Sequence, residues 1–159
     1  MKKTCFTLIF GLIFSTLALA QKNEDHPIVG MWQLGKAVNN GHETNVNRIV
    51  QLKQYLDNGV FQVFVTTGPG KTFQTIKGTY QITSDSTYSE TIEAAINQRM
   101  IGRTYDILYH VNGGQLDLDG NVTTPNRTNP SVIDTFNYVE EWKRVEHVST
   151  IMQSQASQN

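Results

Sequence analysis

Hydrophobic and polar residues alternate along most of the chain from residue 28 onward, and this alternation predicts β-strands. Clusters of Gly, Asn, Asp and Pro separate the alternating stretches, and Asn58-Gly59 is typical of a tight hairpin turn. The expected strands cover residues 28–38, 48–56, 60–67, 73–83, 87–95, 101–111, 115–119 and 132–145. Residues 93–100 fit either a short helix or a continued strand, and residues 39–47 and 120–131 are expected to be loops.

The short connections between these stretches indicate how the strands are arranged. Consecutive strands joined by tight turns, without long crossovers, are typical of an antiparallel sheet. A barrel is favoured over an open sheet because closure removes the exposed sheet edges. We therefore predict an all-β fold, an antiparallel up-and-down β-barrel of about eight or more strands.

The first twenty residues have the three parts of a secretory signal peptide. Lys2 and Lys3 form the positive region, residues 6–19 are apolar, and Ala18-Leu19-Ala20 is a small-x-small cleavage site. The apolar run is shorter than the roughly 20 residues that span a bilayer, so we expect cleavage after Ala20 and no membrane span.

Beyond the leader, the chain length suits one domain. We expect a flexible lead-in at residues 21–27, a barrel domain at 28–146 and a polar tail at 147–159. The single cysteine, Cys5, lies in the leader, so the mature chain has neither disulfides nor Cys–zinc sites. An exported domain without disulfides, behind a short leader with two lysines, favours a bacterial protein that is periplasmic or secreted.

Charge narrows the classes of partner. Removal of the two leader lysines leaves 11 basic and 14 acidic residues, a formal charge of −3, and no basic run occurs. Electrostatic binding to nucleic acid or to an anionic membrane is therefore not expected. The four histidines are scattered without metal-ligand spacing, so we expect neither a metal nor another cofactor.

Four short motifs carry a resemblance to a known group of proteins. They are Gly30-Met31-Trp32 and the segments at residues 78–82, 87–90 and 141–145. Over about residues 28–146 the chain resembles the lipocalin-like domains of unknown function that Gram-negative gut anaerobes export. The resemblance implies a calycin-type β-barrel in which Trp32 packs against an arginine near the last strand, for which Arg144 is the candidate. It also implies a cup for a small, partly apolar molecule, and it does not imply catalysis.

Charged residues occur among aromatic residues on the faces that we expect to point inward. Because side chains alternate along a strand, these candidates are Tyr88 with Glu90, Arg103 with Tyr105, and the set Phe136, Tyr138, Glu140 and Trp142. Arg103 and Tyr105 combine a guanidinium with a phenol, which suits a carboxylate or phosphate head group. Tyr80, Tyr88, Phe136, Tyr138 and Trp142 are expected to line the site with aromatic rings. Alternatively, Glu90 and Arg103 pair with each other inside a filled barrel.

The function predicted from the sequence is non-catalytic binding of a small amphipathic or carboxylate-bearing molecule inside the barrel. Two alternatives remain open at this point. One is a protein-interaction module with a filled barrel, which docks a partner on a strand face or on the 120–131 loop. The other is a hydrolase or isomerase that uses Glu90 and Glu140 as general acid and base.

Overall fold

The computed structural model describes residues 26–46, 49–68 and 70–146, and most of them lie in strands. The predicted leader lies outside the described residues. The strands are β1 Gly30–Asn39, β2 His42–Thr44, β3 Val50–Tyr55, β4 Val60–Thr67, β5 Lys71–Ser84, β6 Thr87–Ala95, β7 Thr104–Asn112, β8 Gln115–Pro125 and β9 Ile133–Arg144. One 3-10 turn, η1, covers Gln98–Met100 between β6 and β7.

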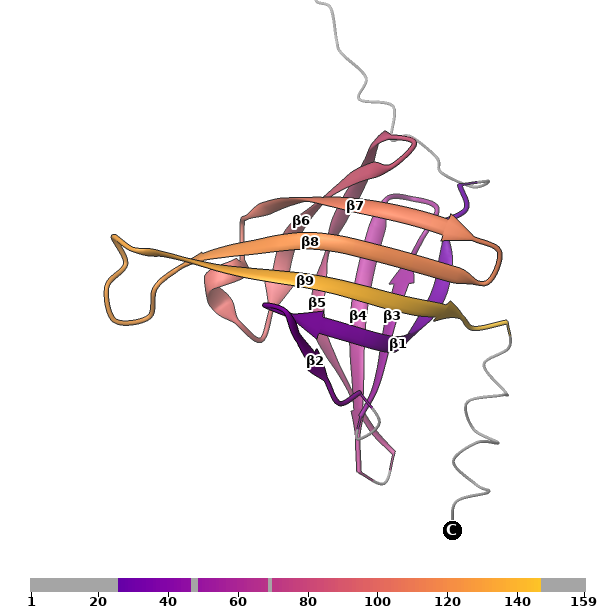
Figure 1. Ribbon diagram of the computed structural model, residues 1–159, viewed down its shortest axis with the longest axis horizontal. Helices are drawn as coiled ribbons and strands as arrows, with labels where there is room; N and C mark the ends of the chain where they lie inside the picture. Colours follow the sequence, from indigo (N-terminus) through magenta and orange to yellow (C-terminus); the bar gives the residue numbers. More distant parts are fainter. Residues whose placement is uncertain (1–25, 47–48, 69, 147–159) are drawn as a thin grey trace, which may run out of the picture.

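Eight of these strands close into an antiparallel barrel (Figure 1). From β3 to β9 each strand pairs with the next along the chain, and β1 closes the ring by pairing with both β3 and β9. The ninth strand, β2, pairs only with β1 and is additional to the ring. The predicted all-β up-and-down barrel is thus confirmed.

Two of the expected loops contain strand. The 39–47 segment forms β2, because Asn40 and Gly41 have φ values of 48° and 79° and turn the chain back onto β1. The loop expected at 120–131 is wrong in its first half, since β8 runs on to Pro125 and pairs with β9 along this length. The expected loop was based on its polar composition, which did not reveal the cross-strand pairing.

The connection between β6 and β7 also differs from the expectation. The undecided segment is strand as far as Ala95 and then forms η1. The strand expected at 101–111 begins only at Thr104, because Gly102 has φ of 77° and the chain still turns there. Ile101 is therefore 46% exposed and does not face the interior.

One end of the barrel is closed by the residues that precede β1. Trp32 is fully buried and donates its indole N–H to the carbonyl of Ile28 at 2.8 Å. The guanidinium carbon of Arg144 lies 4.1 Å from the Trp32 ring centroid, and Arg144 donates a hydrogen bond to the carbonyl of Val29 at 2.9 Å. The predicted packing of Trp32 on Arg144 is confirmed, and it closes this end with an indole and a guanidinium.

The opposite end carries a projecting hairpin. Residues 121–137 of β8 and β9 lie beyond the last pairings with β7 and β1, at Gly120 and Tyr138, and pair with each other. This segment, here called the hairpin arm, extends to the left of the barrel in Figure 1. Arg99 of η1 donates to the carbonyl of Pro125 at 2.8 Å and so joins the arm to the β6–β7 connection.

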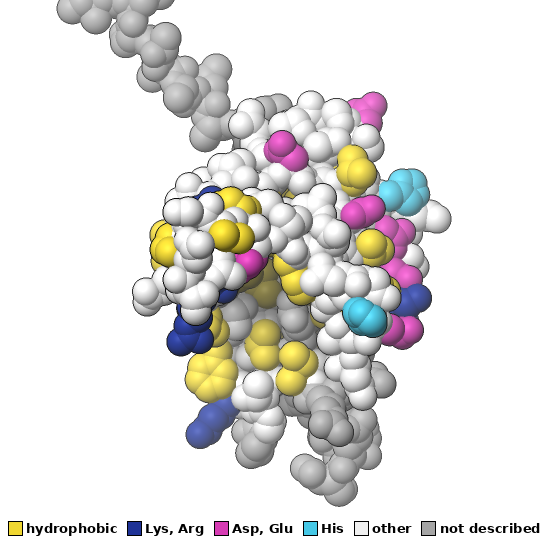
Figure 2. Space-filling view, turned by 60° about the vertical axis from the view of Figure 1, so that its left-hand side comes forward, with side chains coloured by type: hydrophobic (Ala, Val, Ile, Leu, Met, Phe, Trp, Pro, Cys, Tyr) yellow, Lys and Arg dark blue, Asp and Glu magenta, His cyan; other side chains and the backbone are white. Residues whose placement is uncertain are grey.

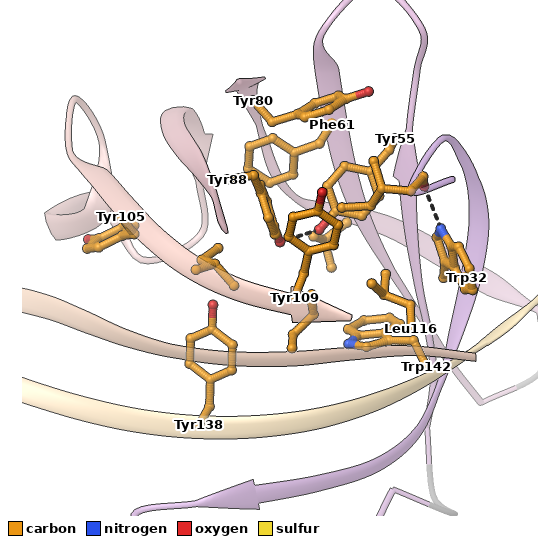
Figure 3. Close-up of a cluster of buried hydrophobic side chains, with 14 of the residues drawn as sticks. Trp32, Tyr55, Phe61, Tyr80, Tyr88, Tyr105, Tyr109, Leu116, Tyr138 and Trp142 are labelled. Atoms are coloured by element: carbon orange, nitrogen blue, oxygen red, sulfur yellow. Dashed lines mark hydrogen bonds between the residues drawn. The ribbon is translucent and has the colours of Figure 1, made fainter. Parts of the chain in front are cut away.

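Aromatic side chains fill much of the barrel interior (Figure 3). Four tyrosine rings make edge-to-face contacts in three pairs. The ring centroids are 5.1 Å apart for Tyr55 and Tyr80, 5.7 Å for Tyr55 and Tyr88, and 5.5 Å for Tyr88 and Tyr109. Such edge contacts add to the stabilisation that burial alone provides. The interior therefore combines a large apolar area with several phenol hydroxyls that need partners.

Candidate functional site

A buried ion pair crosses the barrel interior. Lys53 Nζ on β3 lies 2.6 Å from Glu90 Oε1 on β6, and each side chain is 7% exposed. Strands β4 and β5 lie between β3 and β6 in the ring, so the ion pair links two strands that are not hydrogen-bonded neighbours. Burial of two charges is costly unless each is paired and hydrogen-bonded. The chain meets this requirement with further donors.

Two tyrosine hydroxyls meet the same carboxylate oxygen. Tyr55 and Tyr88 each lie 3.0 Å from Glu90 Oε1, and their own oxygens are 2.6 Å apart. Burial raises the pKa of both phenols well above the usual value, and the Glu90 charge raises each pKa further. Both phenols therefore remain protonated, and their two hydrogens are shared among three oxygens.

A second carboxyl group belongs to the same electrostatic environment. Glu140 on β9 accepts a hydrogen bond through Oε2 from the Trp142 indole N–H at 3.0 Å. Burial raises the pKa of Glu140; the Lys53 cation and the Trp142 N–H oppose this rise, and the Glu90 charge adds to it. Because Glu140 lies on the same face of β9 as the buried Tyr138 and Trp142, the two carboxyl groups share the barrel interior.

Tyr138 contributes a hydroxyl that has no partner among the described residues. Tyr138 as a whole is 9% exposed, and its Oη atom makes no hydrogen bond within the described parts of the chain. Figure 3 shows this hydroxyl pointing from β9 into the interior. Among the described residues, no buried side-chain oxygen or nitrogen is both sealed from solvent and unpaired, so Tyr138 Oη borders accessible space.

Gly120 on β8 allows this orientation of Tyr138. A Cβ atom at Gly120 would lie 2.6 Å from Tyr138 Oη and 2.7 Å from Cζ, which real Cβ atoms do not tolerate. The ring therefore lies across the position of the missing side chain. Burial raises the Tyr138 pKa, and the charges of Glu90 and Glu140 raise it further, so the hydroxyl is a protonated donor that also offers lone pairs.

The end of the barrel that carries the hairpin arm is hollowed. Figure 2 looks obliquely onto it and shows a depression beneath the arm with hydrophobic side chains on its walls. Tyr138 is the last β9 residue before the arm, so its hydroxyl lies on this side of the interior. The depression and the Tyr138 hydroxyl thus lie toward the same end of the barrel.

The predicted anchors, Arg103 and Tyr105, both hydrogen-bond to backbone carbonyls. Arg103 donates through Nε to the carbonyl of Arg99 at 3.0 Å, and Tyr105, 5% exposed, donates to the carbonyl of Thr123 at 3.3 Å. The pair between Glu90 and Arg103 that a filled barrel would have is absent from the described residues, and Lys53 takes the place of the arginine. Sequence reasoning missed Lys53.

The predicted aromatic wall is present in part. Tyr80, Tyr88 and Trp142 are buried, at 5%, 0% and 1% exposed, and Tyr80 donates to the carbonyl of Leu56 at 2.7 Å. Phe136 is 41% exposed on the hairpin arm and does not line the buried wall. Its strand does extend to this position, but the barrel ends before it, so no strand lies opposite to cover the ring.

Metal-binding clusters and membrane-spanning helices are both absent from the described segments. No group of three or more His, Cys, Asp or Glu side chains there is arranged to hold a metal ion. Nor does any helix within those segments have the length and apolar character needed to cross a membrane.

Comparison with known proteins identifies a family without an assigned activity. The family described as "Domain of unknown function (DUF4488)" matches residues 27–151. Solved structures that match include a crystal structure of an uncharacterized protein from Bacteroides eggerthii DSM 20697, which is 16% identical with a TM-score of 0.47. That match covers 74% of this chain and 99% of the other. No curated protein matches the chain. The lipocalin-like resemblance and the gut-anaerobe source stay predictions.

Proposed function

Because the chain belongs to the DUF4488 family of domains of unknown function, we propose a function from its site: the barrel binds a small amphipathic molecule in its interior. The observation that carries this proposal is the Tyr138 hydroxyl: its residue is buried, the hydroxyl points into the barrel and borders accessible space, and it has no partner among the described residues. A ligand group that hydrogen-bonds this hydroxyl takes the place of water there, and a few fixed polar groups of this kind orient a ligand in a mostly apolar site.

The surroundings of Tyr138 support a ligand with a polar head and an apolar body. A ligand site is mostly apolar with a few fixed polar groups, and an eight-stranded barrel that its own side chains do not fill completely holds at most one small molecule. Here the fixed groups are Lys53, Glu90 and Glu140, and the apolar part is the aromatic wall. The depression at the arm end supplies the entrance (Figure 2).

We also propose that the protein acts by binding without catalysis, that it is exported, and that its barrel is lipocalin-like. The motifs of the first strand and the contact between Trp32 and Arg144 support the last point. The leader motif supports export. The Glu90 oxygen that meets Lys53, Tyr55 and Tyr88 already has three partners, and this supports a structural role for that oxygen over a catalytic one.

Native mass spectrometry tests the binding proposal. Protein purified from its native host without detergent is measured before and after denaturing extraction. The proposal predicts a small added mass that disappears on extraction. It is overturned if the native mass equals that of the polypeptide alone and incubation with octylamine, 1-octanol or octanoate adds no mass either.

A protein partner is the second candidate, and the hairpin arm favours it. Val132, Ile133 and Phe136 are 48%, 53% and 41% exposed there, which is unusual for three large apolar side chains so close in sequence. Under this alternative, replacing Val132 and Ile133 with Ser abolishes capture of a partner, whereas ligand binding in the barrel is unchanged.

A further inference from the structure

Three oxygen atoms in the interior are left without donors. Lys53, Tyr55 and Tyr88 all meet Oε1 of Glu90, so Oε2 of Glu90 receives no hydrogen bond from the described residues. The Trp142 indole N–H donates to Oε2 of Glu140, and Oε1 of that carboxyl group receives no hydrogen bond from the described residues. Together with Tyr138 Oη these atoms border accessible space, because the described chain has no sealed and unpaired side-chain oxygen.

The interior also has more carboxyl groups than cationic groups among the described side chains. Lys53 is the one cation among the buried side chains that the structure describes, and it already pairs with Glu90. Glu140 adds a second carboxyl group, on the same β9 face as the buried Tyr138 and Trp142 and hydrogen-bonded to the Trp142 indole. A ligand carboxylate would bring further negative charge beside Glu90 and Glu140, which costs energy in a poorly solvated site. A ligand cation would instead pair with Glu140.

Tyr138 is an independent indication of a ligand. Its side chain is more than nine-tenths buried, its hydroxyl is unpaired within the described residues, and Gly120 leaves the space that lets it point inward. A phenol oxygen has lone pairs that can accept a hydrogen bond from an ammonium group.

We infer that the polar head of the ligand is an ammonium group, held by Glu140 Oε1 and Tyr138 Oη, with Glu90 Oε2 completing the negative surroundings. This inference rests on the proposed binding function and names its ligand class as an amphipathic amine. It replaces the carboxylate head expected from the sequence. The reason is that the cation available for such a head, Lys53, is already neutralised inside the barrel.

Three probes of equal chain length separate this inference from the binding function itself. Calorimetric titration of the full mature chain at pH 8 compares octylamine, 1-octanol and octanoate. The inference predicts that octylamine binds at least about tenfold more tightly than octanol, the amount expected of one charged hydrogen bond, and that octanoate binds most weakly. If octanoate binds as tightly as octylamine, the amine inference fails while the binding function stands. If none of the three binds, the binding function itself fails.

Variants locate the ammonium group. Glu140→Gln is expected to weaken octylamine binding by about tenfold and to leave octanol binding within about twofold, because the amide lacks the charge. Tyr138→Phe is a second variant, expected to weaken octylamine by a smaller factor. Glu141→Gln is the matched control: this neighbour is 49% exposed and contacts Lys36 on the outside, so both ligands bind as before.

The comparison between ligands makes the variants decisive even if stability changes. If Glu140→Gln weakens octylamine and octanol by the same factor, the carboxyl group acts only on the fold and the inference is overturned. If Glu141→Gln weakens octylamine as much as Glu140→Gln does, the effect is a general change in surface charge, and the inference is again overturned.

Discussion

Replacing Lys53 with Met tests whether the buried ion pair holds the interior together. The variant keeps most of the side-chain volume but removes the charge that lies 2.6 Å from Glu90 Oε1. Glu90, 7% exposed, then loses its cationic partner and keeps only the Tyr55 and Tyr88 hydroxyls as donors. The structure therefore predicts a large loss of stability from a substitution that adds apolar character to the core.

The expected magnitude follows from the geometry. At 2.6 Å the attraction is about 6 kcal/mol with an effective dielectric constant near 20, and the cost of burying the charges offsets much of it. Removing one partner of a buried pair typically costs 3–5 kcal/mol because the other charge is stranded. The two phenol donors remain, so we expect about 3 kcal/mol for Lys53→Met.

Urea unfolding followed by tryptophan fluorescence measures this loss, since Trp32 and Trp142 are both buried. Adding Glu90→Gln to Lys53→Met removes the stranded charge and should recover about 2 kcal/mol. Lys36→Met is the control, because its partner Glu141 is 3.7 Å away and both side chains are about half exposed, which limits the loss to at most about 1 kcal/mol. A loss for Lys53→Met no larger than for Lys36→Met would refute the reasoning.

Three other predictions concern the same barrel. The native pKa of Glu140 lies above the ordinary 4.5, so between these two pH values the folded state holds a proton that the unfolded state has lost. The free energy of unfolding should therefore fall as pH rises from 4.5 through the native pKa. Thermal unfolding of Glu140→Gln should lack this fall. Gly120→Ala would place a Cβ atom 2.6 Å from Tyr138 Oη, and we expect it to lower the free energy of unfolding in urea by about 1–3 kcal/mol. A Cβ atom at Gly114 would have no atom within 4 Å, so the control Gly114→Ala should lower it by less than about 0.5 kcal/mol. Arg144→Ala should cost about 2–3 kcal/mol and alter the near-UV circular dichroism of the tryptophans; an unchanged spectrum would contradict its role at the closed end.

The sequence was sufficient for the barrel and for several inward-facing residues. Alternation places Tyr88 and Glu90 on one face of β6, and both are buried. The Trp32–Arg144 contact, which followed from the family resemblance, is present as well. These predictions succeeded because a residue two positions along a strand returns to the same face whatever the rest of the chain does.

Lys53 was missed because Val50 and Leu52 lie on the opposite face of β3 from Lys53 and Tyr55, which are the buried residues of this strand. Val50, Leu52 and Leu56 were grouped as one face, and that face was the obvious apolar one. The hairpin with β4, however, pairs Tyr55 with Phe61 and Lys53 with Val63. Since Phe61 and Val63 are buried, their partners must also face inward. The register across the Asn58-Gly59 turn carried the information that hydropathy alone did not.

The hairpin arm shows the complementary limit. Alternation assigns Phe136 to the same strand face as Tyr138, and the structure agrees, yet Phe136 lies beyond the last pairing of β9 with β1. Where a ring of strands ends depends on the stagger between neighbouring strands, which is a property of the closed barrel. The sequence of a single strand does not contain this stagger, so the exposure of Phe136 could not be predicted from its own segment.

A crystal structure of the mature protein with octylamine is the most direct test of the central claim. The account predicts that the nitrogen lies within hydrogen-bond distance of Glu140 Oε1 and Tyr138 Oη, with the alkyl chain running between the aromatic rings toward the arm end of the barrel. An alkyl chain bound on the outer surface at Val132 and Ile133, with Tyr138 Oη still unpaired, would contradict it.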